Sequence, residues 1–223
     1  MNKNRIFALV YRYFTLLRRD LGKIIDTFYW PLIDIISWGF MTLYLDRNHV
    51  VLGGVANTLL SAMILWTLVY SLARDIAVSF LDDVWDRNVV NLYGSPLQPT
   101  EFLIASFIVA LLRVLFSTVI LIIVANLLFS VNALALGGYF FVAYMLLVIF
   151  SYTLGIFAAT LILKFGPGVE IVAWSTPAIL LPVSAVFFLW MYYRSFYRIL
   201  LILYLLLIFL KICGHILLVS RLI

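Results

Sequence analysis

The densest group of acidic side chains in the sequence is formed by Asp82, Asp83 and Asp86. Residues three and four apart share a face of a helix, so this spacing can present the three carboxylates together. Clustered carboxylates are the ligands with which lipid phosphotransferases hold a divalent metal and a phosphate group. One hypothesis is therefore a metal-dependent lipid-modifying enzyme. We favour the alternative, in which the three residues form a solvated helix face or a docking surface for another protein.

Other patterns that would support catalysis are absent from the sequence. It contains no G-x-x-x-x-G-K-[ST] stretch, so it lacks the usual loop that cradles a nucleoside triphosphate. The Gly-Ser-Pro at residues 94–96 is not a nucleophile elbow, and His49 and His215 lie far apart in the chain. Because Cys213 is the single cysteine, no internal disulfide can form, and one cysteine with two histidines cannot build a three- or four-ligand metal cage of the usual kind. We therefore expect no catalytic, cofactor-binding or metal-binding residues, and any ATP hydrolysis must come from a partner chain.

Four ionisable residues interrupt long apolar segments: Asp34, Arg74, Asp75 and Arg113. Such residues are costly inside a membrane and often functional. Asp34 and the Arg74–Asp75 dipeptide each lie about six residues from the expected cytoplasmic end of their segment, so we expect them at similar depth, where they can neutralise one another. Arg113 lies about eleven residues into its segment, or roughly 16 Å. We expect it to pair with Asp34 or Asp75, and direct contact with a substrate is the alternative.

The composition indicates how these residues are positioned. Of the 223 residues, 66% are hydrophobic and 11% are charged, whereas soluble domains have roughly 45–50% and 25%. The apolar segments lack the alternation of a membrane β-barrel, so the sequence predicts an all-α integral membrane protein, a six-span helical bundle. The expected spans are residues 28–45, 57–80, 102–129, 139–163, 169–191 and 199–210.

The distribution of basic residues predicts the orientation of the bundle. Six Lys and Arg residues precede the first span, and none lies between the third and fourth spans, which places the N-terminus in the cytoplasm. With six spans the C-terminus is also cytoplasmic, as is the polar segment 81–100. We attribute the excess of 15 Lys and Arg over 10 Asp and Glu to this orientation rather than to nucleic-acid binding. Residues 1–25 combine apolar positions at three- and four-residue steps with basic residues, which predicts an amphipathic helix at the membrane interface. A cytoplasmic helix packed on a partner is the alternative.

Four stretches of sequence together indicate a family. Residues 80–88 lead into Asn-Leu-Tyr-Gly-Ser-Pro-Leu-Gln-Pro-Thr-Glu at residues 91–101, just before the third span. With Phe-Tyr-Trp-Pro-Leu-Ile-Asp at residues 28–34 and Trp-x-x-Pro at 174–177, followed by Leu-Pro-Val-Ser-Ala-Val-Phe, the chain resembles the permease subunits of type-2 ATP-binding-cassette (ABC) transporters. The resemblance extends from residue 1 to about residue 187.

The resemblance implies a definite function. The chain would be half of a cell-membrane channel, a half-transporter that dimerises with a second copy or a paralogue. A separate ATPase subunit, which carries the ATP and Mg²⁺, would bind its cytoplasmic face, and the transporter would be an exporter. The residues implied in coupling to that subunit are Asp82, Asp83, Trp85, Asp86, Arg87, Asn91, Ser95 and Pro96. A substrate-capturing subunit of an energy-coupling transporter is a further alternative.

The C-terminal end departs from the family. Its Tyr-Pro and Pro-x-x-Tyr stretches are missing after Phe187, and residues 188–223 are rich in Leu and Ile instead. Trp190 and Met191 have single codons, and reading residues 190–193 from the third base of each preceding codon gives Asp-Val-Leu. We hypothesise that residues 188–223 arise from a shifted reading frame, and a divergent sixth span is the alternative. Genomic sequence with no open shifted frame would exclude the hypothesis.

Overall fold

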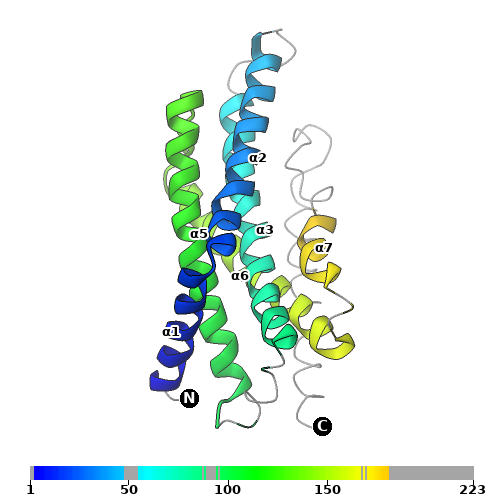
Figure 1. The fold of residues 1–223 in the computed structure, drawn as a ribbon. Helices are drawn as coiled ribbons and strands as arrows, with labels where there is room; N and C mark the ends of the chain where they lie inside the picture. The colour runs from blue at the N-terminus through cyan, green and yellow to red at the C-terminus, as the bar shows by residue number, and fades with distance from the viewer. Residues whose placement is uncertain are drawn as a thin grey trace, which may run out of the picture. The chain divides into compact units, whose positions relative to one another are not determined.

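The computed structural model describes residues 3–47, 55–86, 88, 94, 96–166, 168 and 170–180. This part of the chain is helical, with no strand, as expected (Figure 1). The α-helices are α1 (Lys3–Arg19), α2 (Leu21–Arg47), α3 (Val55–Trp85), α5 (Pro99–Phe129), α6 (Gly138–Phe165) and α7 (Ile171–Ile179), and η1 (Ala133–Leu136) is a 3₁₀ turn.

Three of the described helices are long and apolar enough to cross a membrane. They comprise residues Leu59–Trp85, Pro99–Phe129 and Gly138–Phe165, which contain or closely match the expected second, third and fourth spans. The expected first span lies within α2, which is diluted by Tyr, Trp, Ser and Asp side chains and is not among the three. Of the expected fifth span the structure describes a nine-residue helix, α7, and the expected sixth span lies outside the described residues.

The chain divides into two compact units, which are described separately. The first unit comprises Met1–Ser71 and Gln98–Leu147, and the second comprises Leu72–Leu97 and Val148–Ile223. Helices α3 and α6 each contribute one part to either unit, because the divisions at residues 71–72 and 147–148 fall inside them.

In the first unit, α1 and α2 form almost one helix, interrupted at Asp20. The Asp20 amide donates to the Leu16 carbonyl (3.2 Å), and the Asp20 carbonyl accepts from the Ile24 amide (3.2 Å), so helical hydrogen bonding continues across the break. The Asp20 carboxylate also accepts a hydrogen bond from the Lys23 amide (3.2 Å). A carboxylate that accepts from amides of a first helical turn acts as an N-cap, and Asp20 thereby starts α2.

Helix α2 packs along α5 in the same direction. Phe28 lies edge to face with Phe116, at 5.6 Å between ring centroids, and twelve residues later Phe40 meets Phe129 in the same way, also at 5.6 Å. At the far end the Phe129 ring lies directly against Gly39, where a Cβ atom would overlap it. Two helices that advance together over this length cross the same layer. Helix α5 is apolar enough to span a membrane, and α2 lies beside it from Phe28 to Phe40.

Helices α5 and α6 are joined by a tight turn. Ser130 has a left-handed backbone (φ 53°) and closes α5 with an amide hydrogen bond to the Asn126 carbonyl. The Asn132 side chain accepts from the Leu134 amide (3.1 Å) and starts η1, and Gly137 ends it at φ 56°. The returning helix is antiparallel to α5, and the hydroxyls of Thr118 and Tyr144 lie within hydrogen-bonding distance (3.3 Å).

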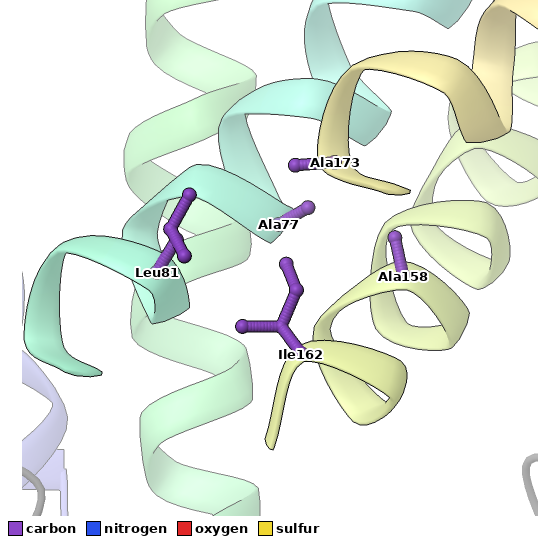
Figure 2. Packing of buried hydrophobic residues seen from close by; sticks show 5 residues of the cluster. All are labelled: Ala77, Leu81, Ala158, Ile162 and Ala173. Carbon is purple, nitrogen blue, oxygen red and sulfur yellow. The ribbon is translucent and has the colours of Figure 1, made fainter. Parts of the chain in front are cut away.

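In the second unit, α3, α6 and α7 share a small apolar core. Its members are Ala77, Leu81, Ala158, Ile162 and Ala173, with at most 1% of each residue exposed (Figure 2). Gly155 allows the close approach, since a Cβ atom there would lie 2.8 Å from Ile76 Cβ and 3.0 Å from the Ala73 carbonyl oxygen. The contacting residues follow one another in the same order along both helices, so the described parts of α3 and α6 run parallel here.

Candidate functional site

The acidic end of α3 is anchored by a local hydrogen-bond motif. Asp83 is buried, with 3% of its surface exposed. Its carboxylate accepts from the Asn88 side-chain amide (3.0 Å), and its carbonyl accepts from the Asn88 backbone amide (3.0 Å). The chain after Trp85 is therefore fastened back onto the last turn of α3. A buried carboxylate that accepts side-chain and backbone hydrogen bonds serves as a structural anchor.

Of the neighbouring acidic residues, Asp86 faces outward and Asp82 is half-buried. Trp85 is 51% exposed, and Asp86 and Pro96 are exposed as well. Among the described residues, no three His, Cys, Asp or Glu side chains are grouped so that they could hold a metal. The surface combines an exposed indole with an exposed carboxylate, which is suited to binding another protein. Three residues expected at this site, Arg87, Asn91 and Ser95, lie outside the described residues.

The start of α5 is built around Glu101, which is 1% exposed. Pro99 opens the helix, where a missing amide hydrogen is harmless. The Glu101 carboxylate reaches back and accepts the Gln98 amide (3.2 Å), while the Glu101 amide donates to the Gln98 carbonyl (2.9 Å). This reciprocal arrangement satisfies amides that the helix start would otherwise leave unpaired. Glu101 thus fixes the point at which the chain turns into α5.

Glu101 also joins α5 to α1. Its Oε2 lies 3.9 Å from Nη1 of Arg5, whose side chain is 39% exposed. One residue further along α5, Phe102 packs edge to face against Tyr13, at 5.9 Å between centroids. Helix α1, the expected amphipathic helix, therefore packs with one face on the first turns of α5. The sequence indicated Glu101 as part of a motif. It did not identify Arg5 as the partner of Glu101, because nothing distinguishes Arg5 from the other basic residues of α1.

Arg113 binds uncharged oxygen atoms at the start of α2. Its Nε donates to the Thr27 hydroxyl (3.2 Å), and its Nη2 donates to the same hydroxyl and to the Lys23 carbonyl (3.4 Å). No ion pair joins it to Asp34 in the described part of the chain, where Asp34 lies exposed on α2. Asp75, the other expected partner, is paired within the second unit. Arg113 therefore lies level with the residues that immediately precede the expected first span.

Arg74 and Asp75 neutralise each other inside the second unit. They are 4% and 7% exposed, and Nη2 of Arg74 lies 3.3 Å from Oδ1 of Asp75. The Arg74 guanidinium also lies over the Trp174 ring of α7, at 5.8 Å from the centroid. A cation over an indole face is attracted by the ring quadrupole. This contact was not foreseen, because the sequence suggested Trp174 only as part of a motif.

The structure thus brings the expected residues into three separate local groups. Asp82, Asp83, Trp85 and Asp86 are at one end of α3, Arg74 and Asp75 are a closed pair, and Arg113 is tied to α2. Asp34 is in none of these groups. None of them has the geometry of a nucleophile with its base. No protein-family model and no curated protein matches the sequence.

Proposed function

We propose that the chain is the membrane-spanning permease subunit of an ATP-driven ABC type-2 transporter, an exporter of the cell membrane. ATP and Mg²⁺ are bound by a separate cytoplasmic ATPase subunit, and a second permease copy or a paralogue completes the channel. The observation that carries the proposal is the arrangement around Glu101. The same carboxylate caps α5 and pairs with the N-terminal amphipathic helix, which gives a physical role to the motif residue that suggested the family.

Helix directions support the proposed topology of six spans with both termini in the cytoplasm. In the first unit, α2 and α5 run in the same direction, as the first and third spans must. In the second unit, the described parts of α3 and α6 also run in the same direction, as the second and fourth spans must. Alternating crossings require both relations. The proposal extends this pattern to two further spans after residue 168.

The acidic end of α3 is suited to receive the ATPase subunit. Trp85 offers a large apolar contact and Asp86 a charge, while Asp83 and Asn88 fasten the segment below them to α3. Movement of a partner bound at Trp85 would therefore move α3 itself rather than only a flexible loop. Rigid-body movement of helices is the usual means by which such subunits convert closure of an ATPase into alternating access.

Isolation of the complex tests the proposal. The full chain, purified under mild conditions from the membranes of its own cells, is expected to retain a subunit that carries a P-loop, in equal amount, and to hydrolyse ATP. Replacing Trp85 by Ala together with Asp86 by Lys should remove the subunit and the activity, because both side chains are exposed at the proposed docking surface.

A matched control separates docking from folding. Leu127 is 76% exposed on the apolar surface of α5, so Leu127→Ala should leave the subunit bound. Equal loss of the subunit in the control, or hydrolysis by the permease preparation with no P-loop subunit present, would contradict the proposal. Metal-dependent turnover of lipid by the isolated chain would support the enzyme hypothesis instead.

A further inference from the structure

A single exposed stripe runs along α1 and continues onto α2. Its apolar members are far from buried: Phe7 is 72% exposed, Tyr11 67%, Phe14 44%, Leu21 71% and Ile25 60%. They recur at steps of three and four residues, with one exception between residues 14 and 21, where the position is filled by Arg18. Because helical hydrogen bonding continues across Asp20, the exposed face of α1 continues as the exposed face at the start of α2.

This stripe differs from the face that packs on α5. The packed face of α1 includes the buried Leu9 and also Tyr13, which contacts Phe102. At about 100° per residue, Phe7, Phe14 and Arg18 lie within about 40° of one another and roughly 160° away from Leu9. Within the part of the chain that the structure describes, α5 covers one face of α1, and the apolar residues of the opposite face stay exposed.

The level of the membrane boundary follows from Arg113. It bonds to Lys23 and Thr27 from a position fourteen residues after Pro99, the first residue of α5, and α5 has 31 residues, or about 46 Å, against a hydrocarbon core of roughly 30 Å. The first turns of α5 therefore extend beyond the core on this side. Arg5 of α1 lies beside those turns, so we place the start of the core near Thr27. This level agrees with a first span that starts at Phe28, but it lies about eleven residues further along α5 than the expected start of the third span at residue 102.

Arg18 lies where the headgroups of the adjoining leaflet must be. It is nine residues before Thr27, about 13 Å along a straight helix and less along a tilted one, and its long side chain extends the reach of the charge. Its guanidinium lies over the Phe14 ring, at 5.2 Å from the centroid. This contact holds the group on the stripe with its N–H groups available at the edges. Guanidinium binds phosphate oxygens in pairs.

We propose that this stripe is a binding site for an anionic phospholipid of the inner leaflet. Arg18 binds its phosphate, and Ile25, two residues before Thr27, contacts its acyl chains. The charge of the helix favours an anionic over a zwitterionic lipid, since α1 contains Lys and Arg but no Asp or Glu. The proposal uses the position of α2 as a span, which belongs to the proposed function, but it does not require an ATPase or a cargo.

Local fluorescence quenching tests the site in the full chain. Cys213 is the single cysteine, so a Cys213→Ser, Leu21→Cys variant carries one fluorophore one turn from Arg18. In phosphatidylcholine nanodiscs, nitroxide-labelled phosphatidylglycerol should quench it at about one fifth of the concentration that labelled phosphatidylcholine requires, as expected for one basic residue near the surface. Arg18→Gln should remove most of the difference, and Arg18→Lys should keep most of it.

Arg19 provides the matched control. It is exposed like Arg18 but lies about 100° away around the helix, so Arg19→Gln should leave the fivefold preference unchanged. Equal quenching by both lipids in the parent variant would overturn the lipid site while leaving α2 in the membrane. Absence of quenching by either lipid would overturn the placement of the stripe as well. Equal loss in both glutamine variants would show a general effect of charge and would also overturn the proposal.

Discussion

Arg74 in the second unit and Arg113 in the first both lie in apolar helices, and they are stabilised in different ways. Arg74 is almost fully buried and is paired with the carboxylate of its own neighbour in the chain, Asp75. Arg113 is partly buried and binds a hydroxyl and a carbonyl from another helix. The first arrangement neutralises a charge within α3. The second uses a charge to fix the level of α2 against α5.

The two arginines also differ in the groups that their removal leaves behind. Without Arg74, a buried carboxylate loses the cation 3.3 Å away. Without Arg113, Thr27 still donates its hydroxyl to the Lys23 carbonyl (2.7 Å), so the remaining groups keep a hydrogen bond. An uncompensated buried charge costs more than a lost hydrogen bond to a neutral partner. We therefore expect the two substitutions to differ strongly in stability.

The largest effect is expected for Arg74→Met. It leaves Asp75 buried without its guanidinium partner and removes the contact with Trp174, so the free energy of unfolding should fall by about 3–5 kcal/mol. Thermal unfolding of the purified protein in detergent measures the change. The double variant Arg74→Met, Asp75→Leu removes both charges and should recover most of the loss. If the double variant is no more stable than the single one, the neutralisation account of this pair is wrong.

A smaller effect is expected for Arg113→Met. The substitution removes hydrogen bonds from a charged donor to Thr27 and Lys23, which are worth about 1.5–3 kcal/mol. The same thermal assay should therefore place this variant between wild type and Arg74→Met. Arg113→Lys retains a charge but loses the forked geometry, so it should recover only part of the loss. Destabilisation equal to that of Arg74→Met would remove the contrast between the two arginines.

The two units can also be compared at their tight glycines. A Cβ at Gly155 would meet Ile76 Cβ at 2.8 Å and the Ala73 backbone at 3.0 Å, and neither can move easily. The three atoms nearest to a Cβ at Gly39 all belong to the ring of Phe129, a side chain that can rotate. Overpacking costs roughly 1–3 kcal/mol. Gly155→Ala should fall near the upper value and Gly39→Ala near the lower, with Phe129→Leu relieving the second substitution but not the first.

The sequence predicted the elements better than the contacts between them. Uninterrupted apolar segments identify α5 and α6 unambiguously, because a helix of that composition is stable only in a membrane or a large core. In α2 the signal is weaker, since aromatic and polar residues dilute it. In the structure α2 nevertheless lies beside α5, because Phe28 and Phe40 contact phenylalanine rings of α5. No local sequence pattern specifies these partners.

The charged residues show the same limit. Arg74 and Asp75 are adjacent in the chain, so their pairing was accessible from the sequence. The partner of Arg113 depends on how far α2 is shifted along α5, and this shift is set by the packing of two whole helices. Similarly, Glu101 was accessible as a helix-start residue, but its ion pair with Arg5 depends on where α1 docks. The expected residues Arg87, Asn91 and Ser95 stay predictions.

Site-directed photo-crosslinking at position 85 tests the central claim most directly. Trp85 is half exposed at the end of α3, so a photoreactive residue there should form an adduct with a docked subunit in intact cells, and mass spectrometry identifies the peptide. We expect an adduct with a protein that carries a P-loop, and no such adduct from position 127 on the apolar surface of α5. Adducts from position 85 that never include a P-loop protein would contradict the permease assignment.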